Sequence, residues 1–418
     1  MSINNQWEWA EIDIPASTTP WPTILNNTWA PLIRLSPATP QHPLKLGNIN
    51  YLLDRLVKRG DSSSELNFPL TSFLSPPDMR LWLALRAGES ELSFRMLPTS
   101  RLPSDEWLAL QDHVKKFDKL DTHIKPWLIS TLAQLTLYED CVKLAQGQDF
   151  DLDQTQDSAL AYEIGRALQR IDFRHKLPIQ IFKGILSGQA DSYLRVASAI
   201  QFMVRGSRFK INASMAKKAS QQGEKLLVAE HQAPRDPFRH AVMYSRFYRA
   251  EALVSAVHGS KWTPAEAIEK SDQWHTHAEF FSDHSPEHQQ LLRENKRLVI
   301  EACLKLATRH GDDEGKKFAE KLIAFDGSDP DCLAFVGNYW LSQGNWRLAS
   351  TYHLRAMRRG TVRSVLSAIT AGDLLVHNGH QVTGLKAYQN ALVLDARSIT
   401  AQKRIGIMGE KFGGNITN

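Results

Sequence analysis

Two segments of the chain follow the same pattern. Residues 337–356 read GNYWLSQGNWRLASTYHLRA, and residues 372–391 read GDLLVHNGHQVTGLKAYQNA. Both begin with glycine, have a second glycine at the same later position and end in alanine. Small residues allow two helices to approach closely, and a glycine between them ends the first helix. The pattern therefore predicts two consecutive helical hairpins of one kind.

The spacing of small and aromatic residues in these segments resembles the tetratricopeptide repeat. The matching positions are Gly337, Trp340, Gly344, Trp346, Ala349 and Ala356 in the first copy and Gly372, Gly379, Tyr388, Ala391 and Leu392 in the second. The resemblance implies stacked helix pairs, with small residues inside each pair and aromatic residues between pairs. The second copy departs from the repeat at Gly384, where alanine is usual, and at Ala396, near the expected proline.

Looser copies precede these two segments. Turns centred on Gly259 and Gly311 separate expected helices over residues 237–257, 286–309 and 313–325. We therefore predict a mostly α-helical protein, an α-solenoid of tetratricopeptide-like hairpins preceded by a small α+β or irregular N-terminal domain. The predicted regions are 1–103 for that domain, 104–235 for helical hairpins and 236–418 for tetratricopeptide-like repeats.

The first region differs because twelve of the 19 prolines occur at or before Pro103. Proline lacks a backbone donor and interrupts helices, so this stretch cannot be a regular helical array. It contains one expected amphipathic helix over residues 46–59 and one expected β-hairpin over residues 80–96.

Composition and termini restrict the class of protein. Of 418 residues, 42% are hydrophobic and 23% charged, which is typical of a folded chain. Residues 1–15 have neither the basic region nor the apolar run of a signal peptide, and no stretch resembles a membrane span. The three cysteines are far apart and lack CxxC spacing. These features predict a soluble cytoplasmic protein without membrane contact.

Positive charge is concentrated in the middle of the chain. Residues 165–250 contain 16 lysines and arginines against 5 aspartates and glutamates, although the whole chain carries a formal charge of only +5. A basic segment of this kind favours an acidic partner, such as an acidic peptide, a phosphorylated ligand or RNA. The alternative is a solvated basic surface balanced by acidic helices elsewhere.

The expected helix over residues 237–257 places arginines on its apolar side. Arg239 and Arg246 share a helix face with Met243, Phe247 and Val254. A semi-buried arginine needs a carboxylate, phosphate or aromatic partner, which is either an internal salt bridge or a bound anion. If the face is an anion-binding groove, its candidate residues are Arg205, Arg208, Arg239, Tyr244, Arg246, Tyr248 and Arg249.

One short motif resembles a metal site. The string His284-Ser285-Pro286-Glu287-His288 has the H-x-x-E-H order of inverted zinc proteases, whose two histidines share a helix face. Ser285 followed by Pro286 is instead a helix start, which would separate the two histidines. His284, Glu287 and His288 are the metal-ligand candidates, and the sequence identifies no cofactor.

Two functional hypotheses follow from different classes. The first is an intracellular helical-repeat protein that binds an acidic peptide or protein partner as a scaffold, adaptor or substrate receptor. The second is an enzyme or enzyme subunit that modifies a peptide or small molecule between the N-terminal domain and the basic central helices. Nucleic acid ranks last because the basic segment lacks regularly interleaved aromatic residues. The oligomeric state, including a homo-oligomer, is left open.

Overall fold

The computed structural model describes residues 2–3, 105–134, 138–171, 176–208, 213–231, 234–326, 330–358, 364–394 and 398–412. Within these ranges the chain forms 16 α-helices, one short 3-10 helix and two strands of two residues each. The prediction of a mostly α-helical protein is therefore confirmed for the described residues. The expected helix over 46–59 and hairpin over 80–96 lie outside them.

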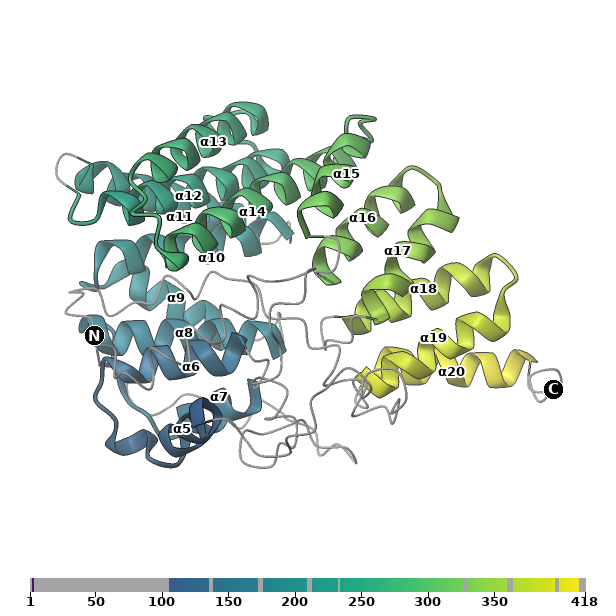
Figure 1. Cartoon of the computed structure of the whole chain (residues 1–418), viewed down its shortest axis with the longest axis horizontal. Helices are drawn as coiled ribbons and strands as arrows, with labels where there is room; N and C mark the ends of the chain where they lie inside the picture. The colour runs from purple at the N-terminus through teal and green to yellow at the C-terminus, as the bar shows by residue number, and fades with distance from the viewer. Residues whose placement is uncertain are drawn as a thin grey trace.

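The helices follow one another with short connections (Figure 1). Strand β1 (Ser2–Ile3) pairs antiparallel with β2 (Phe150–Asp151). The helices are α5 (Asp105–Lys115), η4 (Phe117–Lys119), α6 (Ile124–Gln134), α7 (Tyr138–Ala145), α8 (Thr155–Ile171), α9 (Leu177–Ser187), α10 (Ser192–Arg208), α11 (Ala213–Glu230), α12 (Pro237–His258), α13 (Pro264–Phe280), α14 (Pro286–His310), α15 (Gly315–Asp326), α16 (Pro330–Ser342), α17 (Trp346–Arg358), α18 (Val365–His377), α19 (Gln381–Leu394) and α20 (Ile399–Phe412).

Three successive helices begin with the same local chemistry. Asp236, Thr263 and Ser285 each accept a hydrogen bond from the backbone N–H three residues later, and a proline follows each of them. The cap satisfies a backbone donor that has no partner within the helix, and proline is well accommodated at the first helical position. These signals fix the starts of α12, α13 and α14, and the starts of α12 and α14 are those that the sequence predicted.

Neighbouring helices pack as consecutive pairs. The pairs are α6 with α7, α8 with α9, α10 with α11, α12 with α13, α14 with α15, α16 with α17 and α18 with α19. The first helices also contact one another, since α10 packs against α8 and α12, and α14 packs against α12 and α16. Figure 1 shows the pairs following each other along an arch. The arrangement is compatible with a helical-repeat fold.

The two matching segments contain the close approach that their glycines predict. A Cβ atom added to Gly337 would lie 2.8 Å from the ring of His353, so α16 and α17 meet at van der Waals contact there. Gly372 of α18 approaches the ring of Tyr388 of α19 in the same way. Gly344 and Gly379, at φ +71° and +85°, form the turns inside the two pairs. Residues 337–356 and 372–391, which have the same spacing of small residues, thus lie in two similar helix pairs.

Helix α12 lies at the centre of the packing. Every residue from Phe238 to Val254 is buried, because α10, α11, α13 and α14 all contact this helix. A helix that is buried on all sides could also be a membrane span. Among the described residues, however, no helix combines the length and apolar character needed to cross a membrane.

Candidate functional site

The three arginines of α12 are enclosed by protein. Arg239 is 2% exposed, Arg246 1% and Arg249 9%. All three lie away from solvent, which the helical periodicity of the sequence predicted for Arg239 and Arg246 only. Because they occupy different heights on one helix, they meet different neighbours.

Arg239 contacts the beginning of α10. Its guanidinium lies 5.6 Å from the centroid of the Tyr193 ring. Burial lowers the pKa of Arg239, and the negative charges of Asp191 and Asp236 oppose that shift. This arginine therefore belongs to the contact between α10 and α12, a full two turns of helix away from Arg246.

Arg246 faces α8 and α14. Burial and the neighbouring charge of Arg249 lower the pKa of Arg246 to about 9, while Glu294 of α14 and Tyr162 of α8 oppose the shift. The guanidinium therefore keeps its proton at neutral pH. Its enclosure leaves no direct access for a partner in this structure, so a binding role for Arg246 remains a prediction.

A network of buried charges continues from α12 into α14. Arg297 bonds to Glu294 through Nε and to Glu301 through Nη1, both at 3.1 Å, and Lys305 bonds to the other oxygen of Glu301. Burial alone would raise the pKa of Glu301, but the charges of Lys305 and Arg297 outweigh it and hold the pKa at about 2. Arg249 contributes to the same effect from α12. Glu301 is therefore the anion around which these cations gather.

The two candidate tyrosines lie elsewhere. Tyr244 stacks on Trp274 of α13, with ring centroids 4.1 Å apart and planes within 6°. Tyr248 stacks on Tyr244, one turn further along α12. Lys270 Nζ of α13 lies 5.6 Å from the centroid of the Tyr248 ring. Both rings point toward α13, whereas Arg246 faces α8 and α14, so the structure does not bring the tyrosines and arginines into one site.

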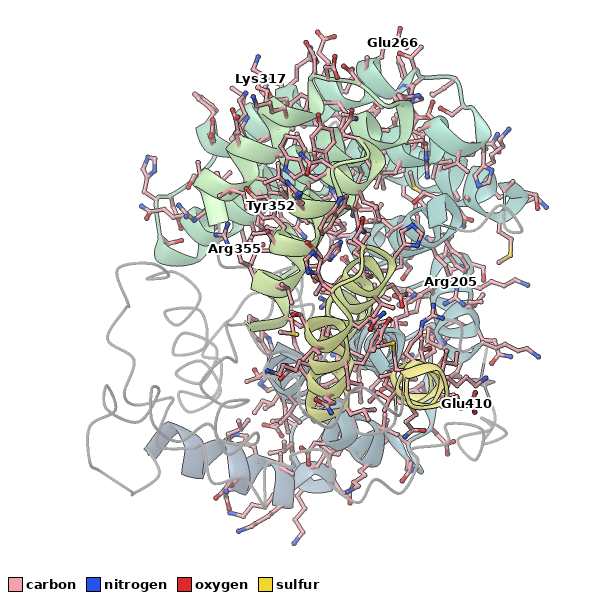
Figure 2. The ribbon with its side chains drawn as sticks, turned by 90° about the vertical axis from the view of Figure 1, so that its right-hand side faces the viewer. Arg205, Glu266, Lys317, Tyr352, Arg355 and Glu410 are labelled. Carbon is pink, nitrogen blue, oxygen red and sulfur yellow. The ribbon has the colours of Figure 1, made fainter. Side chains whose placement is uncertain are left out.

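Arg205 and Arg208 occupy the last turn of α10 rather than a turn before α12. Helix α10 continues to Arg208. Arg205 is buried. It is labelled in Figure 2, which places it apart from Tyr352 and Arg355 of α17. The side chain of Arg208 lies outside the described part of the structure.

A pocket of about 450 Å³ opens where the C-terminal halves of α10, α12 and α14 meet α16. Lys305 and Arg309, one turn apart on α14, supply its positive charge. We call it the cationic pocket, because none of the described residues that line it is acidic. Its other lining residues are Val204, Ser207, Leu253, Leu304, Leu306, Thr308, Phe335 and Asn338.

The network of buried charges and the cationic pocket lie on the same side of α12 and α14. Leu253, which lines the pocket, is one turn beyond Arg249 on the same face of α12. Lys305 bonds to Glu301 and at the same time lines the pocket, with Nζ 4.0 Å from the centroid of the Phe335 ring. The network of buried charges in α12 and α14 therefore extends to the cationic pocket, which is open to solvent.

The polar groups of the pocket favour an anion. Arg309 and Asn338 are exposed at the rim, and the Asn338 side chain forms no hydrogen bond to another described residue. The hydroxyls of Ser207 and Thr308 donate to the carbonyls of Val204 and Leu304, so they can only accept further hydrogen bonds. The donors left for a ligand are cationic or amide N–H groups, which suit a carboxylate or phosphate.

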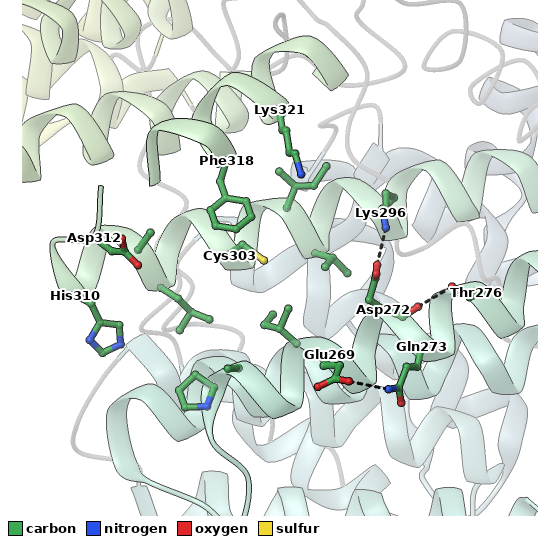
Figure 3. A pocket seen from close by; sticks show the side chains of 17 residues that line it. Glu269, Asp272, Gln273, Thr276, Lys296, Cys303, His310, Asp312, Phe318 and Lys321 are labelled. Atoms are coloured by element: carbon green, nitrogen blue, oxygen red, sulfur yellow. Dashed lines mark hydrogen bonds and ion pairs between the residues drawn. The ribbon is translucent and has the colours of Figure 1, made fainter. Parts of the chain in front are cut away.

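A second, larger hollow lies between α13, α14 and α15 (Figure 3). This groove of about 690 Å³ has an apolar floor that includes Ile268, Ile300 and Phe318. Its rim carries charges of both signs, and Lys296 already pairs with Asp272 at 2.6 Å. Burial raises the pKa of Cys303 in the floor to about 11, so the thiol is protonated at neutral pH and is a poor nucleophile.

The predicted interruption of the H-x-x-E-H string is present. Helix α14 begins at Pro286, between the two histidines, and His284 has a positive φ of 59° outside it. His288 stacks on Phe238 and bonds to Asp283 at 2.8 Å. The side chain of Glu287 lies outside the described residues. No group of three potential ligands is arranged to hold a metal ion in the part of the chain that the structure describes.

Sequence reasoning missed Lys305, Arg309 and Phe335. A signal existed, because Lys305 and Arg309 are four residues apart near the end of an expected helix and therefore share a face. The contribution of α16 could not be found in this way, because it depends on how the pairs stack.

The sequence matches no protein-family model and no curated protein. The tetratricopeptide resemblance consequently rests on residue spacing and on the packing of consecutive helix pairs.

Proposed function

We propose that this chain is a tetratricopeptide-like helical-repeat protein that binds an acidic peptide or protein segment. The helix pairs form a continuous α-solenoid. The segment lies over the C-terminal ends of α10, α12 and α14 beside α16, where the cationic pocket opens, because the rest of α12 is enclosed by protein. The observation that carries the proposal is the cationic pocket, where two basic side chains meet and none of the described lining residues is acidic. Lys305 is already paired with Glu301, so an acidic segment would supply negative charge chiefly to the exposed Arg309.

The buried arginines have a supporting part in this proposal. Arg246, Arg249 and Arg297 leave an excess of positive charge around Glu294 and Glu301, close to the pocket. Such charge attracts an acidic segment over a distance and raises its association rate, whereas direct contact is made by the more exposed Lys305 and Arg309. The cytoplasmic setting expected from the sequence belongs to the same proposal.

An unbiased peptide selection tests the proposal. A library of random peptides would be selected on the full chain, and we expect the enriched peptides to be rich in aspartate and glutamate. Their affinity should fall as sodium chloride is raised, since salt screens exposed charges. Enrichment of neutral or basic peptides would contradict the proposal.

The alternative of an enzyme with a site beside residues 1–103 depends on residues outside the described part. It remains the second hypothesis from the sequence.

A further inference from the structure

The cationic pocket has an apolar wall as well as positive charge. Val204, Leu253, Leu304 and Leu306 line it together with the ring of Phe335. A bare inorganic anion would leave this wall in contact with water, and its volume of about 450 Å³ is in the range that accommodates small organic ligands. The lining thus suits a ligand that is partly apolar.

The positive groups are placed beside that wall rather than opposite it. Lys305 Nζ lies over the Phe335 ring, and Arg309 follows one turn later on α14. An anion held by both would have its remaining atoms directed toward Phe335 and Leu253. The exposed amide of Asn338, three residues after Phe335 on α16, can donate to the same anion from the other side.

We infer that the cationic pocket is a subsite for an anionic group carried on an apolar body of about the size of an aromatic ring. The anion is a carboxylate or a phosphate monoester. It comes either from a free organic acid or from a side chain of the bound segment. This inference rests on the proposed function only in the second case, where the side chain belongs to the acidic partner.

Calorimetric titration of the full chain with phenyl phosphate and 3-phenylpropionate tests the inference. We expect both to bind more tightly than inorganic phosphate, and the neutral isostere 3-phenylpropanamide to bind at least about tenfold more weakly than the acid, because the charged hydrogen bonds are lost. Binding of the neutral isostere with the same affinity as the acid would overturn the inference.

Two variants locate the binding. Arg309→Gln should weaken the binding of phenyl phosphate by about tenfold or more. Phe335→Ala should weaken the binding of phenyl phosphate more than that of inorganic phosphate, because it removes the ring against which the apolar body packs. Any loss that comes from Lys305, whose Nζ lies over that ring, is shared by both ligands. The matched control is Lys317→Gln, which removes one exposed positive charge on α15, outside the pocket (Figure 2). Equal losses in Arg309→Gln and Lys317→Gln would show a general charge effect and no subsite.

Titration with peptides distinguishes the two sources of the anion and separates this inference from the proposed function. A phosphotyrosine peptide that binds more tightly than phenyl phosphate identifies a side chain of a partner, and exclusion of that peptide identifies a free organic acid. If acidic peptides bind but phenyl phosphate and 3-phenylpropionate do not, the subsite fails and the proposed function stands. If the small acids bind and acidic peptides do not, the proposed function fails instead.

Discussion

The residue that best explains the charged interior is Glu301. It accepts from Arg297 and Lys305, and it lies close enough to Arg249 for their charges to interact. Three cations without this carboxylate would repel one another in a space with little water. Buried ion pairs add little net stability, but breaking one by removing a single partner is costly.

Replacing Glu301 should therefore destabilise the protein strongly. We expect Glu301→Gln to lose about 3–5 kcal/mol of unfolding free energy, because Arg249 and Lys305 lose their counter-charge and Arg297 keeps only Glu294. Urea denaturation measures the loss, with the exposed Glu320→Gln on α15 as the control. A variant as stable as the wild type would show that Glu301 is not the centre of the network.

The same carboxylate should confer a pH dependence. Its folded pKa of about 2 is below the ordinary value of 4.5, so the folded state favours the charged form. The stabilisation is complete above pH 4.5 and is lost as the pH falls toward 2. Over that window the unfolding free energy of Glu301→Gln should fall less steeply than that of the wild type.

The sequence predicted which side chains are buried better than it predicted which residues they contact. Periodicity placed Arg239 and Arg246 on the apolar side of α12, where they are found. The sequence analysis grouped Tyr244 and Tyr248 with Arg246, although each is two residues from it, which on a helix means about 200° of rotation, and both rings face α13 instead. The identity of the partners did not, because Glu294, Glu301 and Tyr162 belong to helices far away in the chain.

Among the helices, the pair α16 and α17 tests the repeat pattern most clearly. Gly337 faces His353, and Ala356 is fully buried in the same pair. Side chains added here have no room, whereas Gly406 of α20 has no atom within 4 Å of the position of an added Cβ. The two glycines therefore provide a matched comparison.

We expect Gly337→Leu and Ala356→Trp to destabilise the protein by about 1–3 kcal/mol or more through overpacking. Gly406→Ala should instead stabilise it by roughly 0.5–1 kcal/mol, since alanine suits an open helical position better than glycine. Melting temperatures of the three variants provide the comparison. If Gly337→Leu melts like the wild type, the close approach of α16 and α17 is not needed for stability.

Helix boundaries could be predicted because they depend on local chemistry. Asp236, Thr263 and Ser285 mark three helix starts through capping and a following proline, and Gly259 and Gly311 mark two ends. The cationic pocket could not be predicted in the same way. Its walls come from α10, α12, α14 and α16, so it exists only once successive pairs have stacked.

For the whole molecule, the distribution of charge matters more than its total. The net charge of +5 is small, but four buried arginines and three exposed lysines of the basic segment lie on different helices. Arg205, Arg239, Arg246 and Arg249 are buried in first helices, while Lys217, Lys218 and Lys225 are exposed on the second helix α11. The sequence showed the excess of charge, and only the fold shows that the basic side chains of the cationic pocket, Lys305 and Arg309, lie beyond the segment, on α14.

If an acidic segment occupies the cationic pocket, site-specific photocrosslinking will locate it there. A photoreactive phenylalanine derivative would replace Asn338, at the rim of the pocket, or Gln273, at the rim of the groove between α13, α14 and α15. Both positions are exposed, so both variants should fold. We expect an acidic peptide from the selection to crosslink at 338 and not at 273. Crosslinking at 273 alone, or equally at both positions, would contradict the account.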